Sequence, residues 1–157
     1  MNTQVNAILA GIILTGACAS LAISEPNNLS GKPFVIDGDT IVINSTHIRL
    51  WGIDAPEMHQ PFGPQAKQGL EGMLFMLNGP LTCTQKAVDK YKRIVAQCFI
   101  NKVDVGSKLV SFGYAWDYTQ YSKGYYKQEQ AVAQKERLGL WQQSNPQPPW
   151  EFRHGHN

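Results

Sequence analysis

The fold is decided by the stretch Phe34-Val35-Ile36-Asp37-Gly38-Asp39-Thr40-Ile41-Val42-Ile43, which the turn Asn44-Ser45-Thr46 joins to a second apolar run over 47–53. Two apolar runs separated by a short polar turn predict a β-hairpin. Aspartate and glycine are disfavoured inside strands, yet they interrupt the first run. The interruption is therefore either a β-bulge whose aspartates cap backbone amides or a cluster of functional carboxylates.

The rest of the chain alternates between helical and strand patterns without an internal repeat. Residues 54–63 carry two prolines and predict a loop. Apolar spacing and turn signals predict five further elements: a helix at 64–79, strands at 81–85 and 93–100, and helices at 105–112 and 122–138. Val105, Leu109 and Phe112 are expected on one helix face, and Gly139 as a left-handed helix cap. Strands with interleaved helices and no βαβ alternation predict an α+β domain around a small β-barrel.

The composition limits the function classes but selects none. The chain has 157 residues, of which 43% are hydrophobic and 17% charged, and its formal net charge is +2. These values exclude a disordered polyelectrolyte and a multi-pass membrane protein, and the net charge is too small to indicate nucleic-acid binding by itself. The length predicts one domain over 33–142, preceded by a linker at 23–32 and followed by a loosely ordered tail at 143–157 that is rich in Pro, Trp and His.

Residues 1–22 resemble an export signal. An apolar run from Ala7 to Ala22 ends in small residues, and Ala17-Cys18-Ala19 matches a cleavage site. Three alternatives stay open: a short membrane anchor at 5–23, a bacterial lipoprotein site ending at Cys18, and a buried cytosolic helix. A secreted or periplasmic location is expected, with membrane anchoring in the cell envelope as the alternative.

Carboxylates and arginines gather around the hairpin. Asp54 and Glu57 directly follow its second strand, and the start of one hairpin strand lies beside the end of the other, so Asp39 and Asp54 can converge. Clustered carboxylates need a cation between them, and oxygen ligands suit Ca²⁺ or Mg²⁺. Arg49 and Arg93 can bind phosphate oxygens, although each could instead be a surface partner of a nearby carboxylate. A hard cation with guanidiniums is what phosphodiester hydrolysis requires.

Four ordered motifs carry a family resemblance: residues 35–40 (VIDGDT), 48–57 (IRLWGIDAPE), 89–93 (DKYKR) and 139–141 (GLW). Together they resemble the staphylococcal nuclease family over about residues 33–141. The resemblance implies an OB-fold, a five-stranded β-barrel with packed α-helices, and Ca²⁺-dependent cleavage of DNA and RNA. It also implies loss of the 5′ oxygen, which gives 3′-phosphate products. A monomer without an obligate protein partner is expected.

The resemblance also assigns site residues one by one. Asp39 and Asp54 resemble the metal carboxylates, and the backbone carbonyl of Ala55 would be a further ligand, although the founding nuclease has threonine there. Glu57 resembles the carboxylate that positions or deprotonates the attacking water. Arg49 and Arg93 resemble the two phosphate-binding arginines.

Substrate contacts are expected from a turn and from an aromatic stretch. Lys90 and Tyr91 lie in the turn, and Tyr91 matches a tyrosine that contacts substrate phosphate in the family. Lys92 replaces a glycine of the family and adds charge there. Tyr118 and Tyr121 lie in the region of a tyrosine pair that packs on the nucleotide, whereas Tyr114 and Trp116 are equally compatible with the core.

Two other function classes remain. The chain could be a catalytically silent OB-type module that binds single-stranded nucleic acid or a protein partner, because the fold is a common binding scaffold. It could also be a structural envelope protein, for which only the apolar leader and the Pro/Trp tail argue. The joint presence of three carboxylates and two arginines favours the nuclease; they are Asp39, Arg49, Asp54, Glu57 and Arg93.

Cys83 and Cys98 lie on the two strands that flank the turn at 89–93. If that hairpin closes over Lys90 and Tyr91, the two cysteines face each other at a Cα distance of about 4.5–5.5 Å, which a disulfide accepts. The alternative is two buried free thiols, as in a cytosolic enzyme. A bridge would fix the strand that carries Arg93.

Overall fold

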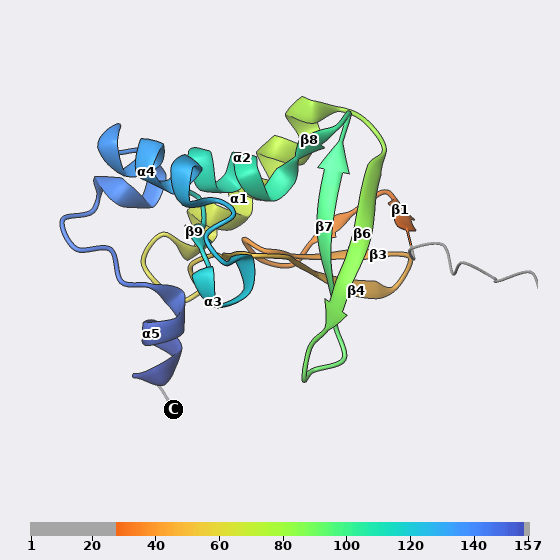
Figure 1. Ribbon diagram of the computed structural model, residues 1–157, viewed down its shortest axis with the longest axis horizontal. Coiled ribbons are helices and arrows are strands. Elements are labelled where there is room, and N and C mark those ends of the chain that lie inside the picture. The colour runs from red at the N-terminus through yellow and green to blue at the C-terminus, as the bar shows by residue number, and fades with distance from the viewer. Residues whose placement is uncertain (1–27, 156–157) are drawn as a thin grey trace, which may run out of the picture.

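Two long β-hairpins cross to form the frame of the protein. The computed structural model describes residues 28–155. The main sheet has seven strands in the order β1 (Asn28–Gly31), β6 (Leu81–Val88), β7 (Ile94–Ile100), β4 (Thr46–Leu50), β3 (Thr40–Ile43) and β2 (Phe34–Val35), with β8 (Val103–Asp104) paired to β7. In Figure 1 the β6–β7 hairpin runs steeply across the β3–β4 hairpin. A separate pair joins β5 (Ile53–Asp54) to β9 (Trp116–Asp117).

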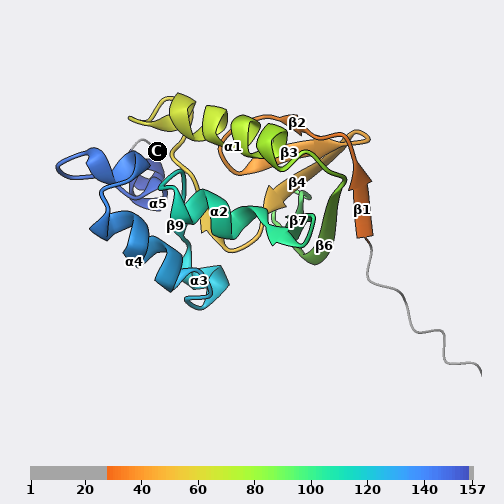
Figure 2. The same ribbon diagram turned by 90° about the horizontal axis from the view of Figure 1, so that it is seen from above.

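Five α-helices complete the α+β architecture. They are α1 (Gly63–Leu77), α2 (Val105–Ser111), α3 (Thr119–Ser122), α4 (Lys127–Lys135) and α5 (Pro149–His154), and a 3₁₀ helix η1 spans Gly139–Gln142. Figure 2 shows α1 running along the β2–β3 region, while α3, α4 and α5 gather at the end of the molecule opposite β1. The OB-like barrel with packed helices is therefore confirmed, with short strands β1, β2 and β8 added to its long hairpins.

The core fills the space between the curled sheet and helices α1 and α2. Large buried aliphatic side chains of the core come from β3, β4, β6, β7, α1 and α2, and include Ile41, Ile43, Ile48, Leu70, Leu81, Ile100, Leu109 and Val110. Burying one such side chain contributes about 1.5–3 kcal/mol relative to leaving it in water. The core therefore gives the site a rigid base.

The register of the β6–β7 hairpin explains its crosslink. Cys83 is paired directly with Cys98, their Cα atoms are 4.0 Å apart, and the two residues form a disulfide. The expected bridge is thus present. On the other side of β7, strand β4 pairs in parallel, with Arg49 level with Val95.

Three expected boundaries change. Residues 28–31 of the expected linker form β1. This strand pairs with β6, so the backbone N–H and C=O groups on that edge of β6 find hydrogen-bond partners. The strand expected over 47–53 is broken after Leu50, because Gly52 has a φ of 75° that ordinary residues rarely adopt. The helix expected over 122–138 is shortened to α4, because Lys123 has a left-handed backbone conformation that ends α3 before α4 begins.

The C-terminal third differs further from expectation. Gly139 has the expected left-handed φ of 52°, but it begins η1, and α4 ends earlier, at Lys135. Phe112 follows the end of α2 and is 46% exposed, so it does not share the buried face of Val105 and Leu109. The tail is not loosely ordered: residues 149–154 form α5, which begins at a proline and buries Phe152.

Candidate active site

Asp39 lies at the bend between β2 and β3. Its backbone N–H donates to Asp37 Oδ1 at 3.1 Å, so Asp37 caps a local backbone amide as one interpretation predicted. The expected β-bulge is wrong, because β2 pairs antiparallel with β3 and the segment is the turn between these two strands. The Asp39 carboxylate points elsewhere: its Oδ2 accepts a hydrogen bond of 2.7 Å from the backbone N–H of Ala55.

Arg49 joins Asp39 to Asp54. It lies on β4 opposite Thr40, and its guanidinium pairs with Asp39 and, at 2.6 Å, with Asp54 Oδ1. The Arg49 side chain is 14% exposed and that of Asp54 only 1%. The structure thus brings together the ends of the two hairpin strands as predicted.

Burial and charge oppose one another in this cluster. Burial acts to lower the pKa of Arg49, but the negative charges of Asp39 and Asp54 outweigh it and hold that pKa above its ordinary value. Burial also raises the pKa of Asp54, and the attraction of Arg49 and Arg153 offsets only part of this effect. The cluster is therefore tightly coupled, and each charge depends on its partners.

Glu57 lies on the loop between β5 and α1. Its backbone N–H donates to Gln60 Oε1 at 3.1 Å, and its backbone carbonyl accepts from the N–H of Gln60 at 2.8 Å. Gly63 packs so closely that a Cβ there would lie 1.9 Å from the Glu57 carbonyl oxygen, which only glycine avoids. The loop therefore holds Glu57 next to Asp54 through its own backbone contacts.

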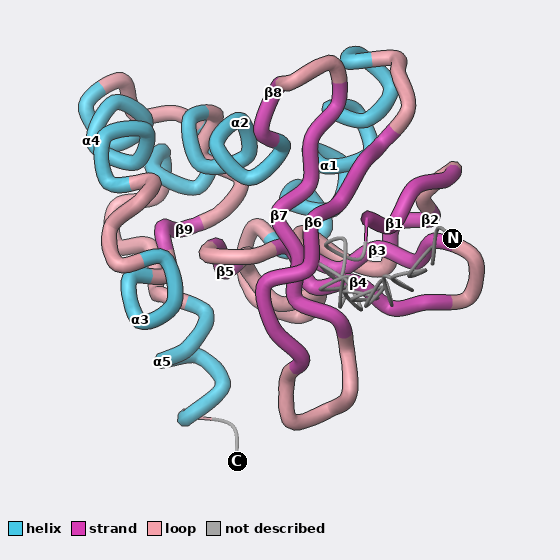
Figure 3. The backbone as a smooth tube through the Cα atoms, turned by 45° about the vertical axis from the view of Figure 1, so that its right-hand side comes forward, coloured by secondary structure: helices cyan, strands magenta, loops and turns pink. Residues whose placement is uncertain are grey.

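Arg153 completes the cluster and was missed by the sequence prediction. Its Nη2 lies 2.7 Å from Asp54 Oδ2, and its Nη1 lies 3.2 Å from Asp54 Oδ1 and 2.7 Å from Glu57 Oε1. It comes from α5, which Figures 1 and 3 place next to α3. One sequence signal indicates that this segment is ordered: apolar residues surround Pro149, the residue at which α5 begins.

Arg93 lies apart from this cluster. Its Nε pairs with Asp89 Oδ2 at 2.7 Å within the β6–β7 turn, and its guanidinium lies 5.5 Å from the ring centre of Tyr91. Arg93 directly precedes β7, two residues before Val95, which is level with Arg49. Its side chain is held by its own turn.

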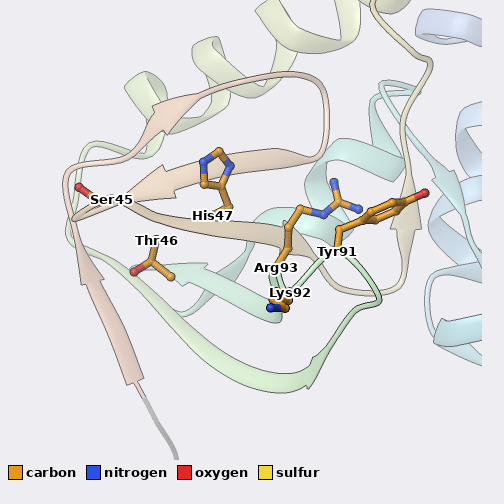
Figure 4. A pocket seen from close by; sticks show the side chains of 6 residues that line it. All are labelled: Ser45, Thr46, His47, Tyr91, Lys92 and Arg93. Atoms are coloured by element: carbon orange, nitrogen blue, oxygen red, sulfur yellow. The ribbon is translucent and has the colours of Figure 1, made fainter.

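An open hollow of about 560 Å³ lies beside this turn. It is lined by residues of the β3–β4 and β6–β7 turns: Ser45, Thr46, His47, Tyr91, Lys92 and Arg93. Figure 4 shows Arg93 and Tyr91 extending to the same side, and Lys90 lies 5.0 Å from the Tyr91 ring. The expected contact residues of the turn therefore form a basic surface next to an aromatic ring.

The aromatic stretch is divided between packing and surface. Tyr114 packs against Phe62, and Trp116 lies 4.3 Å from Trp141 between ring centres, so both belong to packing clusters. Tyr118 contacts Tyr121 at 5.1 Å, but its other partner is Trp150 of α5, stacked at 5.2 Å and 15°. Burial, and then the charge of Asp54, raises the pKa of Tyr118, which is therefore near the acidic cluster.

The donor set suits a hard cation in its chemistry. Asp39, Asp54 and Glu57 offer carboxylate oxygens, and the group already attracts two guanidiniums. Ca²⁺ takes six to eight oxygen ligands, so a few protein oxygens would leave positions for water and phosphate. Within residues 28–155, no set of three or more His, Cys, Asp or Glu side chains is already arranged to hold a metal ion. The backbone N–H of Ala55 donates to Asp39, whereas the backbone carbonyl of Ala55 stays a predicted ligand of the metal.

Comparison with known proteins identifies the family of the chain. The family model described as staphylococcal nuclease homologue matches residues 47–143. An uncharacterized endonuclease of Haemophilus influenzae is 35% identical over 84% of this chain and 76% of its own length. A micrococcal nuclease of Shigella flexneri is 32% identical over 92% and 93%, respectively. A staphylococcal-like nuclease of Arabidopsis thaliana is 37% identical over 73% of this chain, which spans 35% of that protein. The chain belongs to the staphylococcal nuclease family.

Proposed function

We propose that the protein is a Ca²⁺-dependent nuclease that hydrolyses phosphodiester bonds of DNA, RNA or both. The observation that carries the proposal is the cluster at one end of the barrel in which Arg49 pairs with Asp39 and Asp54, and Arg153 pairs with Asp54 and Glu57. The relatives named endonuclease and micrococcal nuclease support nuclease activity in general.

Asp39, Asp54 and the backbone carbonyl of Ala55 would hold the cation. Bound there, Ca²⁺ supplies a positive charge that offsets the phosphate charge and polarises a phosphoryl oxygen. Asp39 is kept in position by the N–H of Ala55, and Asp54 by Arg49, so the two carboxylates face the same place before substrate arrives. Because both carboxylates are already in position, less rearrangement of these side chains is needed during the reaction.

The remaining residues act on water and phosphate. Glu57 orients the attacking water and accepts its proton at a carboxylate oxygen. Arg49 donates hydrogen bonds to the phosphate oxygens that gain negative charge, and Arg93 does the same once it leaves Asp89. The sugar oxygen then leaves, which by the family resemblance is the 5′ oxygen. Lys90, Tyr91, Tyr118 and Tyr121 contact the bound strand.

We also propose that the protein acts outside the cytoplasm, secreted or periplasmic, or anchored in the cell envelope. The leader-like stretch that motivates this proposal lies outside the described residues. The Cys83–Cys98 disulfide supports it, because disulfides persist in oxidising compartments. Within residues 28–155, no helix has the length and apolar character needed to cross a membrane.

The test is a cleavage assay on single- and double-stranded DNA and on RNA, first with added Ca²⁺ and then with a chelator. Cleavage that stops with the chelator and returns with Ca²⁺ is expected. A chain that binds these strands without cutting them under either condition would instead be the binding module considered above.

Substituting Glu57 tests its role within the reaction. Glutamine keeps the shape of glutamate but carries no charge and accepts no proton. We therefore expect Glu57→Gln to lower kcat by about 10²-fold or more while KM changes little. Glu71→Gln, on the exposed face of α1, is the matched control and should retain the wild-type constants. A normal kcat with a raised KM would make Glu57 a binding residue.

A further inference from the structure

Arg153 contacts the acidic cluster from beyond the C-terminal end of the matched family range of 47–143. Its guanidinium makes a two-pronged contact with Asp54 and, through Nη1, also a bond to Glu57. These are the carboxylates to which the proposed function gives a metal and a water. A cation supplied by the chain therefore already contacts the oxygens that Ca²⁺ would need.

The charges of the cluster favour competition. Three carboxylates (Asp39, Asp54 and Glu57) are joined by ion pairs to two guanidiniums, which leaves one uncompensated negative charge. Without Arg153 the same group would carry two negative charges, the match for a divalent cation. Ca²⁺ bound to the oxygens that Arg153 contacts would lie close to its guanidinium, and repulsion between two cations at such short distances disfavours their binding together.

Helix α5 is held at the site independently of Arg153. Gln60 Nε2, on the Glu57 loop, donates to the carbonyl of Gln147 at 2.7 Å. The ring of buried Phe152 lies 5.2 Å from that of His59, and Trp150 stacks on Tyr118. The Arg153 side chain, which is 39% exposed, can therefore leave the carboxylates while the helix stays attached.

We propose that Arg153 is a positioning residue that holds Asp54 and Glu57 in the metal-free protein and competes with Ca²⁺ for them. This inference rests on the proposed function, because it concerns the same cation site. Arg153 keeps the two carboxylates close together until the metal arrives, and its presence lowers the metal affinity. Binding of Ca²⁺ and contact of Arg153 with the carboxylates therefore exclude one another.

The test is Ca²⁺ titration of the full chain by calorimetry, after removal of bound metal, without nucleic acid. We expect Arg153→Ala to bind Ca²⁺ about tenfold more tightly than the wild type, within the usual range for coupled sites. Arg153→Lys keeps the charge but cannot bridge both carboxylates as a planar fork, so its affinity should lie between the two. Arg137→Ala, which removes an exposed arginine elsewhere, is the matched control and should match the wild type.

Thermal unfolding provides a second readout. In chelator, Arg153→Ala should melt at a lower temperature than the wild type, because Asp54 and Glu57 lose a partner. In saturating Ca²⁺ this difference should close or reverse. A purely structural arginine would lower the melting temperature equally in both conditions, and that result would overturn the proposal.

The outcomes separate this inference from the proposed function. If the wild type binds Ca²⁺ and Arg153→Ala binds it equally or more weakly, the competition is refuted and the nuclease proposal stands. If no variant binds Ca²⁺, the proposed metal dependence fails, and the inference fails with it. Should Arg153→Ala not fold, the comparison of Arg153→Lys with the wild type decides the matter.

Discussion

Arg49 and Arg93 are expected to do the same work on phosphate, but the molecule holds them in different ways. Arg49 lies inside the barrel end between two buried carboxylates, Asp39 and Asp54, which the pairing of β3 with β4 and the chain after β4 bring to it. Arg93 lies at a hairpin turn and pairs with Asp89, four residues earlier. Arg49 is thus fixed by the tertiary fold, and Arg93 by its local turn.

The two arginines therefore differ in how much the stability of the fold depends on them and in how easily they can bind phosphate. Removing Arg49 leaves Asp39 and Asp54 facing one another in a buried place, so its charge supports both the fold and the reaction. The Asp89–Arg93 pair is partly exposed and local, and such pairs contribute about 0–1 kcal/mol. Arg93 can exchange a carboxylate for a phosphate at little cost.

The largest effect is expected from Arg49→Ala. It should reduce cleavage by about 100-fold or more, as for loss of a strong transition-state donor. It should also lower the free energy of unfolding by about 3–5 kcal/mol, the usual cost of leaving a buried charge unpaired. Cleavage assays and denaturant unfolding of the same samples measure both quantities. Near-normal turnover by the folded variant would remove Arg49 from the proposed reaction.

The disulfide variant Cys83→Ala/Cys98→Ala examines the frame that carries Arg93. The bridge closes a loop with a sequence separation of 15, and its loss should lower the free energy of unfolding by about 3 kcal/mol in the chain-entropy model. Denaturant unfolding of oxidised wild type and variant measures this. Reduced wild type should behave like the variant. Identical stability with and without the bridge would contradict the expectation.

For Arg93→Ala we expect a clear loss of cleavage with little change in the free energy of unfolding. Cleavage should fall about tenfold, less than for a buried donor, while the free energy of unfolding changes by at most about 1 kcal/mol. Arg137→Ala serves again as the exposed control. If Arg93→Ala destabilises the chain as much as Arg49→Ala does, the proposed contrast between the two arginines is wrong.

The smallest effect concerns the pH dependence of the Asp89–Arg93 pair. Burial acts to raise the pKa of Asp89, but hydrogen bonds from Arg93 and Tyr91 outweigh it and hold the pKa below the ordinary value of 3.8. A lowered pKa means that the folded state binds fewer protons. The stabilisation is therefore present above that ordinary value and is lost as the pH falls through the folded pKa.

Asp89→Asn removes this contribution. The difference in melting temperature between the wild type and Asp89→Asn should be small near neutral pH and should shrink as the solution is acidified below the ordinary pKa of 3.8. Melting curves across an acid series measure it. A difference that grows with acidification would reverse the assigned sign.

The sequence predicted those parts of the site that depend on neighbouring strands. Asp39, Arg49 and Asp54 come from one hairpin and its continuation, so pairing of nearby segments brings them together. The disulfide followed in the same way from the register of a single hairpin. Local pattern and turn chemistry are sufficient for such contacts.

The missed features depend on distant segments. Arg153 reaches Asp54 from the C-terminal helix, and no local pattern indicates which surface α5 covers. The same applies to Trp150, whose stacking on Tyr118 comes only from tertiary packing. The break at Gly52 was missed because an apolar run hid a left-handed residue between two strands. Side-chain packing decides the first two, and a backbone conformation that glycine permits decides the third.

The parallel pairing of β4 with β7 has a consequence for how the molecule forms. Each long hairpin can zip up from its own turn, but alignment of Ile48 with Ile94 needs the two finished hairpins to dock across a long intervening stretch of chain. Contacts so far apart in sequence are the slow step of folding, because a large loop must close before they form. Arg49 and Arg93 come from opposite partners of that docking. If both arginines bind phosphate as proposed, cleavage would report the final association of the hairpins, and a half-folded chain with two complete hairpins would be inactive.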